Sequence, residues 1–131
     1  MKIEHVGYMV DDPAKAAEWY IRNLGFKLKR KGGPPANARF LADSTGEVMM
    51  EIYNNPKAKV PDYKSMDPLI LHLALSTDDV AGMRKKLVAA GARPYDEITV
   101  TETGDTVTIV RDPWGFPMQL VKRKEPMVSP S

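Results

Sequence analysis

Four residues of this chain have side chains that could together bind one divalent metal ion. The only two histidines, His5 and His72, each lie in a stretch where apolar residues alternate with others. Glu51 lies in Met-Met-Glu-Ile-Tyr, where an unpaired buried carboxylate would be costly, and Gln119 lies in Met-Gln-Leu. Two imidazoles and a carboxylate suit zinc, nickel, iron or manganese, and an amide oxygen can be a fourth, weaker ligand. We therefore predict a metal site formed by His5, Glu51, His72 and Gln119.

Each of these residues taken alone also has an ordinary structural explanation. A histidine can be satisfied by a backbone carbonyl, a glutamate can lie at a sheet edge, and an amide can cap a loop. An internal repeat favours the metal. The segment His-Val-Gly-Tyr-Met-Val-Asp-Asp from His5 aligns with His-Leu-Ala-Leu-Ser-Thr-Asp-Asp from His72 at an offset of 67 residues, and Glu51 aligns with Gln119 at 68. The four possible ligands thus occupy two pairs of equivalent positions.

The elements that must position these residues follow from the hydrophobic period, which changes from two to about 3.6 and back to two in each copy. This change predicts a βαβββ unit. In the first copy we expect a helix at 13–23 and strands at 3–10, 26–30, 38–42 and 48–53. Asp11 or Asp12 is the expected N-cap of that helix, Pro13 suits its first turn, and Gly25 its end.

The second copy predicts a helix at 80–90 and strands at 69–76, 93–98, 106–110 and 117–122. Each copy also has an Asp-X-X-Gly turn before its last strand, at 43–46 and 112–115. The segment 55–68 is rich in Pro, Lys and Asn and is expected to be a linker. The tail from Glu125 is expected to fray.

The predicted fold class is therefore α+β. Repeats 1–54 and 69–124 form a single domain over residues 1–131, in which a cupped mixed sheet surrounds a central cavity. The length of 131 residues is about that of one ordinary domain. Equivalent positions of the two repeats then approach each other around a pseudo-twofold axis, which places the metal between the repeats.

Composition excludes several classes of function. The absence of cysteine rules out a disulfide framework, a thiolate metal site and a cysteine nucleophile. The formal charge is only +2, and the basic clusters at 27–31 and 122–124 are typical of solvated strand edges that discourage pairing. No apolar run approaches the roughly 18 residues of a membrane span. We expect a cytoplasmic protein that binds neither nucleic acid nor membrane.

Over nearly its whole length the chain resembles the vicinal oxygen chelate superfamily, which includes glyoxalase I, fosfomycin and bleomycin resistance proteins, methylmalonyl-CoA epimerase and extradiol dioxygenases. The motifs that carry the resemblance are His5 on the opening strand, Trp-Tyr at 19–20, Leu-Gly-Phe at 24–26, Met-Glu-Ile-Tyr at 50–53, Leu-His-Leu-Ala-Leu at 71–75 and Asp-Pro-Trp-Gly-Phe-Pro-Met-Gln-Leu at 112–120. The resemblance implies a cupped sheet around a divalent metal, with open positions where a substrate binds through neighbouring oxygens. It also implies a homodimer.

The ligand order His, Glu, His, Gln is most similar to the glyoxalase I pattern, which has His or Gln, then Glu, His and Glu. Gln119 stands where that pattern has a glutamate, and an amide cannot take up a proton at neutral pH. Epimerases of the superfamily place Gln second and Glu last, and extradiol dioxygenases and fosfomycin enzymes usually lack the second-position glutamate. Bacterial glyoxalase I also has an arginine four residues after the first histidine. Met9 at this position argues against glutathione as a cofactor.

Three interpretations follow from this comparison. The leading one is a metal-dependent lyase or isomerase of the lactoylglutathione lyase type, acting on a small molecule, with Glu51 moving a proton. The second is a resistance-type protein that sequesters a small molecule without turning it over, with Trp114, Phe116, Tyr53 and methionines lining the pocket. The third is a dioxygenase-related or degenerate member that binds no metal.

Overall fold

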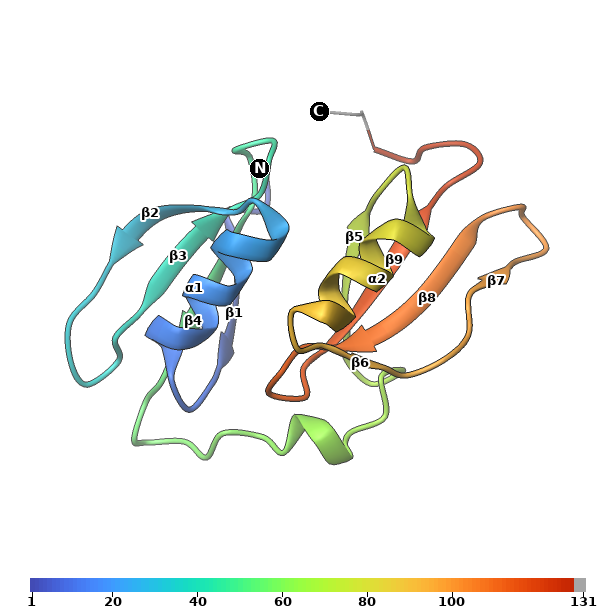
Figure 1. The fold of residues 1–131 in the computed structure, drawn as a ribbon. Helices are drawn as coiled ribbons and strands as arrows, with labels where there is room; N and C mark the ends of the chain where they lie inside the picture. Colours follow the sequence, from blue (N-terminus) through green and yellow to red (C-terminus); the bar gives the residue numbers. More distant parts are fainter. Residues whose placement is uncertain (129–131) are drawn as a thin grey trace. The chain divides into compact units, whose positions relative to one another are not determined.

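A computed structural model describes residues 1–128, which form two compact units of mixed α and β structure (Figure 1). The first unit is Met1–Pro61, and the second begins at Asp62. The boundary between them falls inside the predicted linker. Each unit has one helix on one face of one mixed sheet, which confirms the predicted α+β class with two related repeats. The end of the predicted fraying tail, 129–131, lies outside the described residues.

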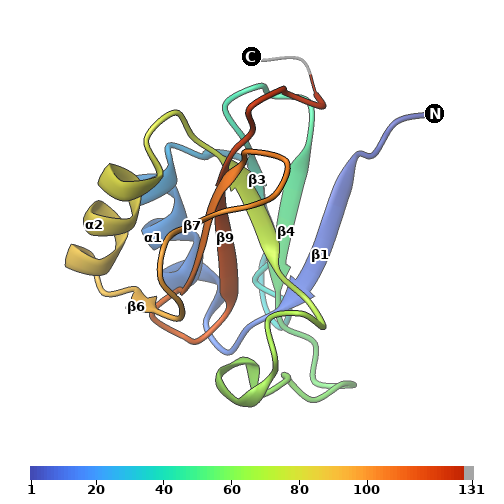
Figure 2. The same ribbon diagram turned by 90° about the vertical axis from the view of Figure 1, so that its right-hand side faces the viewer.

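The first unit follows the predicted βαβββ order. Its elements are β1 (His5–Met9), α1 (Pro13–Leu24), β2 (Lys27–Lys31), β3 (Arg39–Ala42) and β4 (Met49–Tyr53). The strand order in the sheet is β1-β4-β3-β2, with β1 parallel to β4 and the other pairs antiparallel. The first strand of the unit therefore pairs with the last one, as Figure 2 shows.

Both ends of α1 are set by the residues that the sequence predicts. The Asp12 side chain accepts a hydrogen bond from the backbone N–H of Lys15 at 3.2 Å, and Pro13 is the first helical residue. Gly25 ends the helix with φ of 71°, a left-handed conformation that glycine adopts without strain. Helix α1 packs on the sheet through a buried face that includes Tyr20. Each fully buried large apolar side chain contributes about 1.5–3 kcal/mol.

The second unit repeats this plan with one strand divided in two. Its elements are η1 (Tyr63–Ser65), β5 (Leu73–Ser76), α2 (Val80–Ala89), β6 (Arg93–Pro94), β7 (Thr99–Val100), β8 (Thr106–Arg111) and β9 (Pro117–Lys122). The strand order is β5-β9-β8-β6, and β7 pairs with β8. Here too the opening strand, β5, runs parallel to the last one, β9. No helix in the described part of the chain is long and apolar enough to cross a membrane.

Turns before the last strand have the same construction in the two units. The Gly46 backbone N–H bonds the Asp43 carbonyl at 3.1 Å, and Gly46 has φ of 75°. In the second unit the Gly115 N–H bonds the Asp112 carbonyl at 2.9 Å, and Gly115 has φ of 96°. The predicted equivalence of 43–46 and 112–115 is confirmed.

The predicted strand at 69–76 is too long, because the strand begins only at Leu73. Asp67 turns the chain before it: its side chain accepts the Leu69 N–H at 2.9 Å, and its carbonyl accepts the Ile70 N–H at 2.9 Å. An Asp side chain that competes for nearby backbone donors favours a turn over a strand. The apolar side chains of Leu69 and Ile70 are consequently exposed.

The predicted strand at 93–98 is also wrong in its extent, since only β6 forms within it and β7 begins directly after it. Between these two strands, the Asp96 side chain takes the place of a backbone hydrogen-bond acceptor. Its side chain accepts the Ile109 backbone N–H at 2.8 Å and the Thr108 hydroxyl at 2.9 Å. A strand carbonyl would otherwise take the Ile109 donor, so the side chain interrupts regular pairing in this region.

Part of the expected linker is structured. The short helix η1 carries Tyr63, whose buried ring lies edge-on to Phe116 at a centroid distance of 5.0 Å. The Arg111 guanidinium donates to the carbonyls of Tyr63 at 2.7 Å and Met66 at 2.9 Å. The end of the predicted linker thus belongs to the packed second unit.

Candidate metal centre

Two of the four predicted ligands lie close together in the first unit. His5 begins β1 and Glu51 lies on the adjacent strand β4, where its register partner on β1 is Gly7. The distance from His5 Nε2 to Glu51 Oε1 is 3.7 Å. Their side chains are 37% and 23% exposed, so both are accessible to a ligand without lying free in solvent. Strand alternation places them on the sheet face opposite the one covered by α1.

The register of the sheet leaves space for the Glu51 carboxylate. A Cβ atom built on Gly7 would lie 3.1 Å from Glu51 Oε1 and 3.3 Å from Cε1 of Tyr53. These distances are tighter than nearly all real Cβ contacts. The missing side chain of Gly7 is therefore a condition for the observed position of Glu51, and strand register is the signal that could have revealed this.

The His5 ring is held on three sides. Its Nδ1 lies 2.8 Å from Glu4 Oε1, and its Nε2 faces Glu51. The Phe40 ring meets it edge-on at a centroid distance of 5.4 Å and an interplanar angle of 83°. Phe40 is the register partner of Glu51 on β3, so the three strands β1, β4 and β3 together define this position. The sequence analysis did not identify Glu4 or Phe40.

The other two predicted ligands belong to the second unit. Gln119 lies on β9, half-buried, with Ala74 of β5 as its register partner. His72 immediately precedes β5 and is two residues before Ala74, so the two-residue period places it on the same face as Gln119. Its Nδ1 lies 2.7 Å from the Pro68 carbonyl oxygen.

The chemistry of these residues fits a divalent ion. Two ligands that each lie about 2.1 Å from one ion, at octahedral to tetrahedral angles, are about 3 to 3.5 Å apart. The 3.7 Å between His5 Nε2 and Glu51 Oε1 is close to that spacing. In the described part of the chain, however, no group of three or more His, Asp or Glu side chains gathers into a metal-binding cluster. The structure thus shows one close pair of donors, His5 and Glu51, rather than a complete centre.

Three aromatic residues were predicted to line a binding pocket, and Phe116 is the most buried of them. It is 3% exposed and packs against Tyr63 in the interior of the second unit. Tyr53 and Trp114 are half-buried. Tyr53 lies beside the space left by Gly7, on the same face as Glu51.

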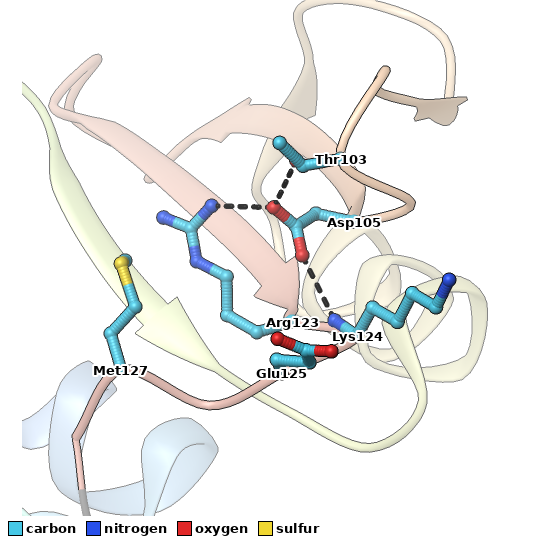
Figure 3. Close-up of a pocket in the computed structure, with 6 residues that line it drawn as sticks. All are labelled: Thr103, Asp105, Arg123, Lys124, Glu125 and Met127. Carbon is cyan, nitrogen blue, oxygen red and sulfur yellow. Dashed lines mark hydrogen bonds and ion pairs between the residues drawn. The ribbon is translucent and has the colours of Figure 1, made fainter.

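A surface pocket of about 350 Å³ lies elsewhere in the second unit (Figure 3). Its lining residues are Thr103, Asp105, Arg123, Lys124, Glu125 and Met127. Asp105 accepts the Thr103 hydroxyl at 2.7 Å, the Lys124 backbone N–H at 2.9 Å and an Arg123 N–H at 3.1 Å. These interactions, the Thr103 hydrogen bond foremost, lower the pKa of Asp105 below its usual 3.8. Because its polar groups pair with one another, we interpret this network as structural.

The sequence from residue 2 to residue 120 matches the family model of the glyoxalase, bleomycin resistance protein and dioxygenase superfamily. The chain belongs to this superfamily. The match covers both units and includes all four predicted ligands. Members of the glyoxalase superfamily include enzymes such as glyoxalase I, bind small molecules and commonly bind divalent metals. A comparison with curated proteins found no match to this chain.

Several solved structures have the same fold as this chain. SMU.1112c is 28% identical, with a TM-score of 0.73 over 92% of this chain and 98% of that one. TnmS3, an antibiotic binding protein from Streptomyces sp. CB03234, is 19% identical, with a TM-score of 0.71 over 95% and 97% of the two chains. A mutant of glyoxalase I from Zea mays is 22% identical, with a TM-score of 0.75 over 95% of this chain and 46% of that one.

Proposed function

We propose that this glyoxalase superfamily protein is a divalent-metal-dependent enzyme of the glyoxalase I-like type, with lyase or isomerase chemistry on a small molecule. The proposed ligands are His5, Glu51, His72 and Gln119, and the proposed metal is zinc or nickel, with iron or manganese as alternatives. The observation that carries this proposal is the approach of His5 Nε2 to Glu51 Oε1 at 3.7 Å, in a space that the absence of a side chain at Gly7 keeps open.

A bound divalent ion would supply Lewis acidity toward two neighbouring oxygens of the substrate. Glu51 is the catalytic residue of the proposal, since its carboxylate keeps an oxygen that can accept a proton, whereas each histidine would give its lone pair to the metal and the amide of Gln119 is not basic. Gln119 can donate an oxygen but cannot act as a base. Proton transfer is therefore confined to the Glu51 side of the substrate.

The charge of the ligand set favours a particular class of substrate. One carboxylate and three neutral side chains reduce a 2+ charge to a net +1, whereas a set with two carboxylates would be neutral. A net positive site attracts an anionic substrate, or one on which negative charge develops during proton removal. We propose such a substrate for this chain.

The experiment that tests this proposal is metal analysis of protein purified without chelator and then reconstituted. We expect up to one zinc or nickel ion per chain, and we expect His72→Ala to lose it. Ser76→Ala is the matched control, because Ser76 is an exposed residue of β5, the strand that His72 immediately precedes, and the change should leave metal content unchanged. Less than about a tenth of an equivalent in the unmodified protein would contradict the proposal.

The alternative is a resistance-type protein that binds a small molecule without metal or turnover. What supports this alternative is the antibiotic binding protein TnmS3, which has a similar fold. A metal-free protein that still binds an antibiotic of the bleomycin class in calorimetry would support this alternative. We further propose that the protein is cytoplasmic and acts as a homodimer.

A further inference from the structure

The hydrogen bonds of the two histidines specify which ring nitrogen each can offer to a metal. A neutral imidazole carries its proton on one nitrogen and a lone pair on the other. The partner of His5 Nδ1 is Glu4 Oε1 at 2.8 Å, and the partner of His72 Nδ1 is the Pro68 carbonyl oxygen at 2.7 Å. A carbonyl and an ionised carboxylate only accept hydrogen bonds, so in both rings Nδ1 must donate. The lone pair is then on Nε2.

The two partners differ in chemistry although their distances from Nδ1 are similar. His72 relies on a backbone carbonyl, which no substitution removes. His5 relies on a carboxylate, which holds the imidazole N–H more strongly because the acceptor is charged. The same His5 ring directs Nε2 toward Glu51, so the Glu4 contact and the proposed metal position lie on opposite sides of one imidazole.

We infer that Glu4 is a positioning residue that fixes the tautomer and orientation of His5, so that Nε2 is available to a divalent metal. This inference rests on the proposed metal site. A carboxylate on the far side of a ligating imidazole also raises the basicity of the ligand, and loss of such partners typically weakens metal binding about 10- to 100-fold. The Glu4 side chain is 73% exposed, so its hydrogen bond contributes little to folding.

The test compares Glu4→Ala and Glu4→Gln with the unmodified protein. Glu18→Ala is the matched control, because Glu18 is a similarly exposed glutamate of the same unit, at 67%, and lies on α1. It corrects for the general effect of removing one negative charge on cation binding. The probe is zinc alone, with affinity measured by competition against a chromogenic chelator.

We expect Glu4→Ala to weaken zinc binding about 10-fold or more beyond Glu18→Ala. Glu4→Gln should fall between the unmodified protein and Glu4→Ala, because an amide oxygen can still accept from Nδ1 but carries no charge. Equal effects of Glu4→Ala and Glu18→Ala, in a protein that binds zinc, would overturn the inference and leave the proposed function intact.

A second readout needs no metal. Long-range ¹H–¹⁵N NMR of the metal-free protein at pH 8.5, where an ordinary histidine is neutral, reports the tautomer of each ring. We expect His5 and His72 both to carry the proton on Nδ1, and Glu4→Ala to change the tautomer ratio of His5 while His72 stays unchanged. Finding His5 with its proton on Nε2 in the unmodified protein would overturn the inference. Failure of the unmodified protein to bind zinc would instead refute the proposed function.

Discussion

Gly7 and Glu51 are register partners on the parallel strands β1 and β4, and a Cβ on Gly7 would lie 3.1 Å from Glu51 Oε1. The Glu51 carboxylate therefore occupies space that a side chain at position 7 would fill. This relationship joins the backbone register of the first unit to the side chain that we propose as ligand and base.

Gly7→Ala should displace Glu51 without preventing folding, because an alanine at a strand position needs no unusual backbone conformation. We expect zinc affinity to fall about 10-fold, the effect typical of disturbing a metal site by a small shift. Gly33→Ala is the control, since a Cβ at Gly33 meets no atom within 4 Å. The same loss in both variants would show that Gly7 has no special relation to Glu51.

Gln119→Glu should raise glyoxalase I activity from a level near zero. The unmodified ligand set provides one carboxylate, whereas the glyoxalase I pattern has two, and the substitution adds the missing proton acceptor. Initial rates with methylglyoxal and glutathione, measured with zinc and with nickel, test this expectation. Met9 can still limit glutathione binding, so Met9→Arg should be combined with Gln119→Glu. Robust turnover by the unmodified chain would contradict our interpretation of position 119.

Asp105 should give the second unit a stability that depends on pH. Its pKa is lowered in the folded protein, so the carboxylate stabilises the fold above its unfolded pKa, near 3.8. That contribution disappears as the pH falls through the folded value. Asp105→Asn should lower the urea midpoint at pH 7, and the difference from the unmodified protein should shrink below about pH 4. Asp78→Asn, at an exposed aspartate, is the control. A difference independent of pH would refute this assignment.

The edges of the two sheets lead us to expect a homodimer. Strands β1 and β5 each pair with one neighbour within their own sheets, and an unpaired strand edge favours association with another chain. We expect light scattering to give about twice the chain mass of 14.6 kDa. A monomer mass across the micromolar range would contradict the homodimer.

Periodicity and turn residues were sufficient to predict most of the first unit, and the last strand of the second, from the sequence. The Asp12 cap, the Gly25 helix end and the final strand β9 (Pro117–Lys122) agree with the structure. The failures occurred where an aspartate side chain bonded to the backbone. Asp67 forms a turn where the apolar pattern predicted a strand. Asp96 interrupts the second strand that the pattern predicted. Apolar periodicity does not record such local competition for hydrogen bonds.

The candidate site was predicted as residue types but not as geometry. The internal repeat showed that His5 and Glu51 have equivalents in the second copy. The sequence could not show, however, that β1 pairs with β4. Without that register, neither the role of Gly7 nor the contact of Phe40 with His5 was predictable. Glu4 was missed because a glutamate beside a histidine has no distinctive spacing.

The pairing of β1 with β4 also determines when the donor pair can exist during folding. His5 and Glu51 meet only after the chain from α1 through β3 has closed into a long loop, since β4 is the sole partner of β1 in its sheet. Closing this long loop costs more conformational entropy than closing a local hairpin. The second unit repeats the arrangement, with β5 attached to its sheet through β9. A nascent chain released before β4 therefore holds His5 without Glu51, and in the proposed site metal capture requires that each repeat has completed its last strand.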